Sequence, residues 1–461
     1  MRVSVILAAG EGTRMKSKLP KVLHKVAGKP MIELVIEAAR KSEVEKISVV
    51  LGHGKEKIEE YLKKEDVIFR YQPIGESNPY GTGFAVMQSL EDFADEDTVI
   101  ILNGDTPLIN HETLNGLLKF HEEGNYSATI LTAMMDNPFG YGRIIRDDDA
   151  NISKIVEQKD ATEKEKLIRE INSGIFVFNG SDLKYGLNLI DTNNSQGELY
   201  LTDVISILVN DNKKIGGYKL RNNEEIIGVN SRDSLCECSK ILQERINREY
   251  MIRGVTLIDD RQIYIEKSVT IGRDTVIYPG AILMGNTTIG EDCIIYGNTR
   301  IIDSTIGNGV EIDNCLIENS SVGDNSKLGP YSHLRPNSNI GKNTKIGNFV
   351  EVKNSNFGDG SKAGHLAYIG DGDVGENVNI GCGVIFANYD GKNKHRSIVG
   401  DNSFIGSNSN LVAPVEIEKN AYVAAGSTIT KTVLEGELSV ERAKQVNIKG
   451  WLEKKGLIKE N

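Results

Sequence analysis

The chain has 461 residues, 26% of them charged and 39% hydrophobic, which is ordinary for a globular protein and long enough for two domains. The net charge of −11 argues against a nucleic-acid-binding surface. The five scattered cysteines form no C-x-x-C pair, so they suggest neither a zinc site nor a disulfide framework, and a reducing cytoplasm fits best. We expect neither a signal peptide nor a membrane span, because glycines and charges follow residues 1–9 at once and no apolar run reaches membrane length.

Strands and helices alternate through the N-terminal half. Short apolar runs at 2–8, 47–51 and 99–102 predict buried strands, and helical spacing of apolar residues follows each of them, at 30–42, 55–62 and 111–122. This alternation predicts a mainly parallel α/β sheet with helices on both faces. Ligands bind beyond the carboxyl ends of the strands in such sheets, so we expect the turns at 10–14 and 103–107 at that rim.

A glycine-rich turn follows the first predicted strand. Gly10 and Gly12 let the backbone approach a ligand, and their N–H groups can line a phosphate, although two glycines also fit a plain tight turn. The turn lacks the Lys-Ser/Thr of the P-loop and the third glycine of the dinucleotide fingerprint. Arg14 adds a positive charge, and Lys21 lies seven residues further on.

Gly10, Gly12, Arg14 and Pro20-Lys21, in this order and spacing, resemble the signature of the sugar-phosphate nucleotidyltransferases, the pyrophosphorylase family. The resemblance implies that Arg14 and Lys21 are catalytic. The segment between Gln72 and Gly81 departs from the family pattern. The implied contacts of UTP and the UDP-sugar are Leu7, Ala8, Ala9, Gly10, Lys21, Gln72, Gly81, Thr82, Gly142, Glu157, Asn172 and Asn230.

The same resemblance implies a metal site. Asp105, in L-N-G-D-T-P at 102–107, and Asn230, in G-V-N at 228–230, match the family's metal ligands, and Mg²⁺ suits such hard oxygen donors. A sugar-1-phosphate oxygen then attacks the α-phosphorus of UTP, and catalysis depends on positioning and on electrostatic stabilisation. Simpler roles stay open for single residues: Asp105 or Asn230 as a helix cap, Lys21 as a surface lysine, and Glu157 as a partner of Lys159.

A long helix is predicted over 231–253. Leu235, Cys238, Ile241, Leu242 and Ile246 form an apolar stripe at helical spacing, and the opposite face is charged. Such a stripe is normally used for packing, and Asn230 or Ser231 can cap the helix. We therefore predict three segments: a uridyltransferase domain at 1–229, a linker helix at 230–253, and a second domain at 254–461.

The second domain repeats with a period of six residues. From Ile265 to Ile429 an aliphatic residue recurs at almost every sixth position, often followed by glycine, so short units stack into a solenoid. The spacing resembles the left-handed parallel β-helix of the hexapeptide-repeat acyltransferases, which implies about nine coils over about 45 Å. A sandwich with evenly spaced turns is the alternative. The period breaks between Phe386 and Val399, which predicts a loop thrown outward.

A second group of polar residues lies in and beside this loop. A lone histidine such as His365 is usually a solvated corner residue, but small residues flank it, and we expect Lys353 one coil away on a similar side. The segments around 363–371 and 388–391 resemble the acetyltransferase domain of the bifunctional N-acetylglucosamine-1-phosphate uridyltransferase/glucosamine-1-phosphate acetyltransferase family. The resemblance covers essentially the whole chain and implies that His365 is the catalytic base.

The resemblance also assigns ligands to this domain. Asn379 matches an acetyl-CoA position as well as a sugar position, and Asn388 and Tyr389 would also position the sugar. Cys382 is either a neutral small residue, which we expect, or a thiol near the coenzyme A sulfur. Glucosamine-1-phosphate is assigned to Arg335, Lys353, Tyr368, Asn379 and Lys394, and acetyl-CoA to Cys382, Asn388, Tyr389, Ser407, Ala425 and Arg442.

The resemblance implies one enzyme with two activities, Mg²⁺ as cofactor, UTP and acetyl-CoA as co-substrates, and a homotrimer. Its partners would be small molecules, with no nucleic acid and no membrane. Two alternatives stay open. One is a single-activity sugar-nucleotide pyrophosphorylase with a non-catalytic β-helix, and the other is a non-enzymatic binding protein of the same architecture.

Overall fold

A computed structural model describes residues 1–75 and 79–458 of the chain. The chain divides into two compact units, Met1–Gln243 and Glu244–Asn461. No helix in the described part of the chain is long and apolar enough to cross a membrane.

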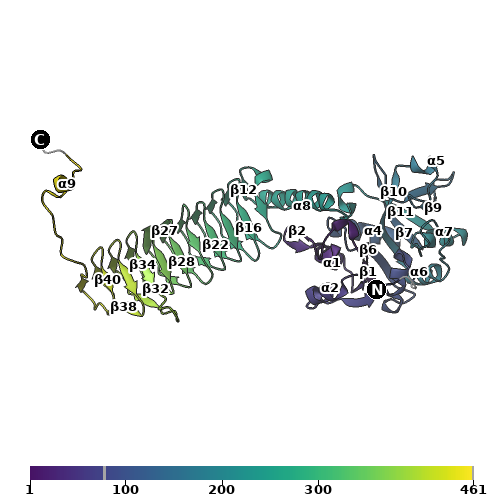
Figure 1. Ribbon diagram of the computed structural model, residues 1–461. Helices are drawn as coiled ribbons and strands as arrows, with labels where there is room; N and C mark the ends of the chain where they lie inside the picture. Colours follow the sequence, from purple (N-terminus) through teal and green to yellow (C-terminus); the bar gives the residue numbers. More distant parts are fainter. Residues whose placement is uncertain (76–78, 459–461) are drawn as a thin grey trace. The chain divides into compact units, whose positions relative to one another are not determined.

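The first unit is built on one twisted, mainly parallel sheet (Figure 1). β1 (Arg2–Ala8) lies between β4 (Lys46–Leu51) and β6 (Thr98–Asn103) and is parallel to both. β10 (Glu170–Asn179) interrupts the parallel order, because it runs antiparallel to β6 and to β7 (Ala128–Met134). The edges of the sheet are formed by β5 (Ile68–Tyr71) and β11 (Ile215–Lys219).

Helices cover both faces of this sheet, as predicted. Alternate residues of β1 point to opposite faces, so Ile6 and Ala8 join one apolar core and Val3 and Val5 join the other. The first core contains α1 (Met31–Lys41), α2 (Lys55–Leu62) and α4 (His111–Glu123). The second contains α3 (Thr82–Met87), α6 (Gly180–Leu187) and α7 (Asp203–Asn210).

The long helix α8 (Arg232–Ile252) runs from the end of the first unit into the start of the second, and its ends lie within one residue of the predicted ones. Ser231 caps it, since its Oγ accepts a hydrogen bond from the N–H of Ser234 at 3.2 Å. Cys238, on the predicted stripe, is buried and packs in the first unit, whereas the amide of Asn247 donates to the carbonyls of Asp260 and Ile263 in the second. The boundary between the units falls inside this helix.

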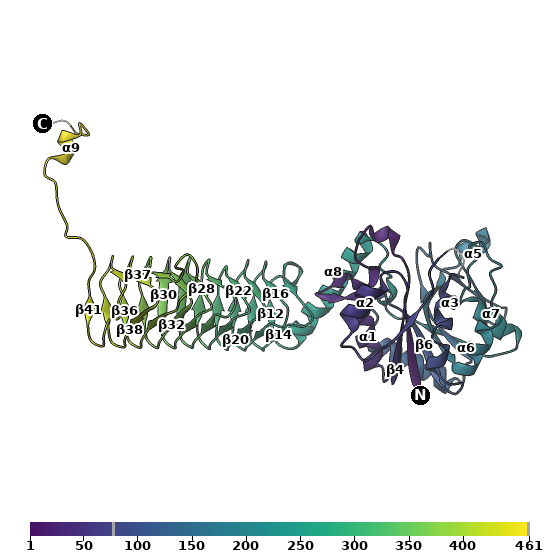
Figure 2. The ribbon, with the colours of Figure 1, turned by 60° about the horizontal axis from the view of Figure 1, so that its bottom comes forward.

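The second unit is a parallel β-helix with three faces, and Figure 2 shows its coils stacked along one axis. Face 1 has 11 strands from β12 (Thr256–Leu257) to β41 (Leu438–Ser439). Face 2 has 10 strands from β13 (Tyr264–Ile265) to β40 (Thr428–Ile429), and face 3 has nine from β14 (Thr270–Ile271) to β38 (Val415–Ile417). The coils begin before Ile265 and continue past Ile429, so the predicted number of about nine is slightly low.

Buried anchors and left-handed corners hold the coils together. The sixth-position residues fill the interior, as with Ile295, Ile346 and Leu411, which are fully buried. Asparagine occupies many corners in the left-handed region, for example Asn325 with φ 57°, because it tolerates this conformation better than other side chains. The predicted outward loop is present between β34 (Ile385–Ala387) and β35 (Ser397–Val399).

Candidate active sites

Three adjoining pockets open at the carboxyl ends of β1 and β6. Asn103, the last residue of β6, lines all three, although the sequence analysis did not select it. Every residue predicted to contact the nucleotide or its sugar lines at least one of them. Those residues are Leu7, Ala8, Ala9, Gly10, Arg14, Lys21, Gln72, Gly81, Thr82, Asp105, Gly142, Glu157, Asn172 and Asn230.

The glycine turn is shaped to accept Lys21. Gly12 has φ +68°, and a Cβ at this position would lie 2.7 Å from the Cβ of Lys21. A larger residue would therefore be strained and would push the lysine away from the rim. Gly10 has open space where its Cβ would be, which leaves its backbone accessible to a ligand.

The ammonium of Lys21 contacts both predicted metal ligands, Asp105 and Asn230. Its ammonium nitrogen lies 2.5 Å from Oδ2 of Asp105 and 3.1 Å from Oδ1 of Asn230, and the Lys21 and Asp105 side chains are only 15% and 18% exposed. Lys21 is thus not a solvated surface lysine. Neither predicted ligand is used as a cap, because Asn110 caps α4 and Ser231 caps α8.

The donor set of this site fits a hard divalent cation. Asp105 offers a carboxylate and Asn230 a carbonyl oxygen, and one ammonium already bridges these two oxygens. Mg²⁺ is commonly held by one or two protein oxygens together with water and substrate phosphates. Among the described residues there is no group of three or more His, Cys, Asp or Glu that could hold a metal, so the fit depends on this sparse pair.

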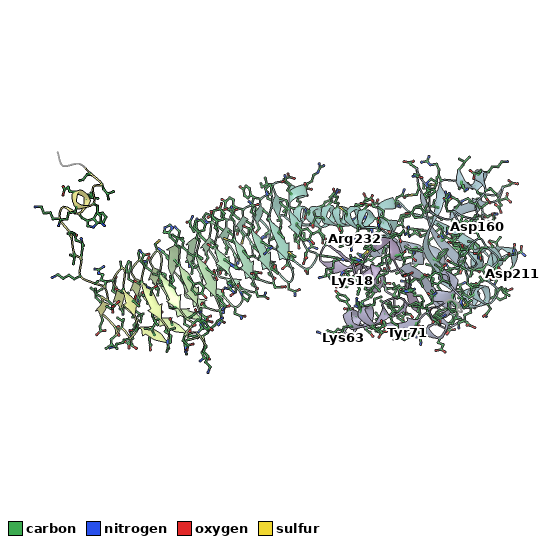
Figure 3. All side chains as sticks on the ribbon, viewed as in Figure 1. Lys18, Lys63, Tyr71, Asp160, Asp211 and Arg232 are labelled. Atoms are coloured by element: carbon green, nitrogen blue, oxygen red, sulfur yellow. The ribbon has the colours of Figure 1, made fainter. Side chains whose placement is uncertain are left out.

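The sugar side of the rim contains a partly buried carboxylate, that of Glu157. Burial raises the pKa of Glu157, and Asp160, labelled in Figure 3, adds to this effect, whereas the Thr202 hydroxyl, which donates to Glu157 at 3.4 Å, opposes it. Glu157 does not pair with Lys159, which donates to Gln196 instead. Asn172 lies where the pairing of β10 with β7 shifts register, and such a bulge re-aims a side chain.

The uracil side contains two further residues. Tyr80 and Glu198 line the same pocket as Gln72, Gly81 and Thr82, and no motif in the sequence indicated them. Gly81 has φ +120°, and a Cβ there would lie 2.4 Å from the carbonyl oxygen of Leu199. Part of the segment between Gln72 and Gly81, residues 76–78, lies outside the described residues.

On the β-helix, His365 belongs to a column at the corner between faces 1 and 2. It pairs in register with Asn348 on the coil before it, and its side chain is exposed. Cys382, Ser407 and Ala425 occupy the matching corner of the following coils, after β33 (Asn379–Ile380), β36 (Phe404–Ile405) and β39 (Tyr422–Val423). Arg442 reaches the same column, where it donates to the carbonyl of Ala425 at 2.8 Å.

The prediction that Lys353 lies one coil from His365 on a similar side is wrong. Lys353 precedes His365 by 12 residues, which is less than one coil. It ends β28 (Glu351–Lys353) on face 2, where it pairs with Gly370, whereas His365 pairs with Asn348 at the other edge of that face. Within one chain, His365 and Lys353 therefore lie on opposite edges of face 2.

Arg335, Tyr368 and Lys394 gather with Lys353 rather than with His365, and Arg335 lies beside Lys353 on the coil before it. Tyr368 lies on face 2, and the Asn388 amide approaches its hydroxyl at 3.5 Å. Lys394, in the outward loop, lies beside Lys353, whose ammonium lowers the pKa of Lys394. Asn388 and Tyr389, assigned above to acetyl-CoA, open the same loop.

Asn379 is placed differently from this group, and Arg335, which lies within it, already has a partner. Arg335 pairs with Glu351 at 2.9 Å, so a carboxylate that the motifs did not indicate already binds this phosphate-binding candidate. Asn379 lies on the outer side of face 1, between Lys362 and Phe404 in register. One chain thus presents the predicted acetylation residues on two faces and does not bring them into one pocket.

Comparisons with known proteins agree with both halves. Residues 3–228 match the nucleotidyl transferase family, and residues 268–303, 319–354 and 396–431 match the bacterial transferase hexapeptide (six repeats) family. The chain is 54% identical to the bifunctional protein GlmU of Clostridioides difficile (strain 630), over 98% of this chain and 97% of that protein. It is 55% identical to the bifunctional protein GlmU of Alkaliphilus oremlandii (strain OhILAs), over 99% of both chains. The chain therefore belongs to the GlmU family of bifunctional proteins.

Proposed function

We propose that this protein is a bifunctional enzyme of UDP-N-acetylglucosamine synthesis. It acetylates glucosamine-1-phosphate with acetyl-CoA, and it transfers UMP from UTP to N-acetylglucosamine-1-phosphate with release of pyrophosphate. The observation that carries the proposal is the Lys21–Asp105–Asn230 group at the rim of the nucleotidyl transferase sheet, in the same chain as the His365 column of the β-helix. We assign the first activity to 254–461 and the second to 1–229.

Uridylyl transfer depends more on neutralising the negative charge of the substrates than on a general base. A phosphate oxygen of the sugar phosphate forms a bond to the α-phosphorus of UTP while the bond to the pyrophosphate oxygen breaks. Arg14, which lines the same pocket as Asp105, and Lys21 neutralise the triphosphate and the charge of the transition state. Asp105 and Asn230 would hold Mg²⁺, which supplies positive charge to the phosphate oxygens. Glu157 and Asn172 bind the sugar hydroxyls.

Acetylation needs a base for the amine. His365 accepts a proton from the sugar amine as the nitrogen forms a bond to the acetyl carbon, and the bond to the coenzyme A sulfur breaks. Lys353 and Lys394 bind the phosphate of glucosamine-1-phosphate, and Tyr368 and Asn388 position the sugar. Ser407, Ala425 and Arg442 bind acetyl-CoA along the His365 column.

We propose that the acetylation site is completed in a homotrimer. Tyr331, Phe349 and Leu366 form an exposed apolar ridge beside His365, at the corner of faces 1 and 2 on three successive coils, 58–59% exposed. The rings of Tyr331 and Phe349 stack with centroids 5.3 Å apart, and all three residues have positive φ, which is costly for bulky side chains. That these exposed apolar residues are present despite their unfavourable φ angles supports contact of the ridge with another copy of the chain. Such a contact would bring Asn379 or Lys353 of one chain to His365 of the next.

Two assays test the proposal. Thiol release from acetyl-CoA should require glucosamine-1-phosphate, and pyrophosphate release from UTP should require N-acetylglucosamine-1-phosphate and Mg²⁺. Pyrophosphate release without thiol release would favour a single-activity pyrophosphorylase, and neither product would favour a binding protein. Free thiols at all five cysteines and the small-molecule substrates support a cytoplasmic location.

A further inference from the structure

Asp371 is a buried carboxylate at the corner between faces 2 and 3, next to the predicted sugar-phosphate residues. It lies between β31 (Tyr368–Gly370) and β32 (Gly372–Val374), is 5% exposed and has φ +51°. The same corner of the four preceding coils also has a left-handed residue. These residues are Asp303, Asn319, Asn337 and Asn354.

The neighbours of Asp371 require an acceptor at this position. The Asn354 amide donates to one carboxylate oxygen at 2.6 Å, and the Asn388 amide donates to the other at 2.5 Å. A carboxylate accepts both bonds, whereas an asparagine would offer one carbonyl oxygen and turn its own N–H groups toward the second donor. Asparagine fits the backbone of this corner, so the requirement at 371 is chemical rather than steric.

Asp371 also holds both ends of the outward loop. Its side chain binds Asn388, where the loop leaves face 2, and its carbonyl accepts from the N–H of Ser397, where the loop ends, at 3.2 Å. Burial alone would raise the pKa of Asp371, but the two amides and the charges of Lys353 and Lys394 outweigh it and hold the pKa below its ordinary value. The carboxylate therefore stays charged beside the two lysines.

We propose that Asp371 is a positioning residue of the acetylation site: it orients the Asn388 amide toward Tyr368 and fixes the loop that carries Lys394. This inference rests on the proposed acetyltransferase function. A buried hydrogen bond to a carboxylate is strong, and its loss leaves a donor unpaired. Loss of the Asp371 charge would also lower its repulsion of the sugar phosphate. This opposing effect is small, because Lys394, which would bind the phosphate, is exposed and solvent screens charges there.

The test is Asp371→Asn with Asp303→Asn as the matched control. Asp303 occupies the same corner with φ +46° and accepts a backbone hydrogen bond from Asn286 at 2.8 Å, four coils earlier. Thiol release should show a kcat/KM for glucosamine-1-phosphate at least tenfold lower in Asp371→Asn. The KM for acetyl-CoA and pyrophosphate release should stay within twofold, and Asp303→Asn should match the wild type in all three.

The outcomes separate this inference from the proposed function. If wild-type protein releases no thiol with glucosamine-1-phosphate, the acetyltransferase function fails. If the wild type is active and Asp371→Asn keeps its kcat/KM within twofold, the positioning role is overturned. A melting temperature of Asp371→Asn well below that of Asp303→Asn, or an equal rise in the KM of both substrates, would reduce Asp371 to a structural residue and also overturn it.

Discussion

Lys21 and Asp105 form an ion pair with 2.5 Å between the ammonium nitrogen and the carboxylate oxygen, and the same ammonium lies 3.1 Å from the Asn230 carbonyl oxygen. If these two oxygens hold a divalent cation, ammonium and metal compete for the same acceptors. The triphosphate of the nucleotide attracts Lys21, so its binding would free the two oxygens for the metal. Metal binding and nucleotide binding should therefore be positively coupled.

Lys21→Met should tighten metal binding while it abolishes uridylyl transfer. Without nucleotide, we expect Mn²⁺ to bind at least tenfold more tightly than to the wild type, about 1.4 kcal/mol, measured from the spin resonance signal of free Mn²⁺. Arg14→Met is the control, since it removes a charge from the same rim but from no residue paired with Asp105. Equal Mn²⁺ affinity of Lys21→Met and the wild type would contradict the competition, and unchanged binding by Asp105→Asn would remove the metal from this site.

The two activities should be separable by single substitutions. Asp105 and His365 belong to different compact units, and each acts in its own proposed reaction. Asp105→Ala should lower pyrophosphate release by at least about 10³-fold and leave thiol release within twofold of the wild type, because it removes a half-buried charge from one site only. His365→Ala should do the converse. Equal loss of both activities in either variant would show that the sites are not independent.

Local sequence patterns predicted the elements well where one face of an element is buried. α2 has the predicted ends, and α4 differs by one residue, because apolar periodicity follows directly from burial. The antiparallel insertion of β10 between β6 and β7 was not predicted, since pairing of strands far apart in the chain leaves no local pattern. Lys21 and Asp105 are 84 residues apart, and only the resemblance to a known family indicated that they meet.

Residue spacing along the β-helix predicted less well which site residues lie together. Each residue's face depends on its position within a coil, so the 12 residues between Lys353 and His365 place them at different edges. Asp371 could have been found from the sequence: it interrupts a run of asparagines at one corner, next to the segment that resembles the acetyltransferase motif. The roles of the individual site residues stay predictions.

Glu157→Gln should stabilise the first unit at the expense of sugar binding. Because burial raises the pKa of Glu157, the folded state disfavours its charged form. The contribution of Glu157 to stability is thus highest below its unfolded pKa of about 4.3 and falls as pH rises toward the folded pKa, whereas the variant lacks this loss. Chemical unfolding at pH 8 should show a gain of roughly 1 kcal/mol that disappears near pH 4, with no gain for the control Lys159→Gln. A gain that is equal at both pH values would contradict the assignment.

Phe349→Asp should dissociate the proposed trimer. Phe349 is 58% exposed and stacks on Tyr331 in the ridge beside His365, so a charge there would be buried without a partner in any interface that covers the ridge. Light scattering should report a monomer, thiol release should fall at least about 100-fold, and pyrophosphate release should persist. Thr288→Asp, which adds the same charge to the exposed side of face 3, is the control and should stay trimeric. A trimeric Phe349→Asp with normal thiol release would show that this ridge is not the interface and that the acetylation site is complete without it.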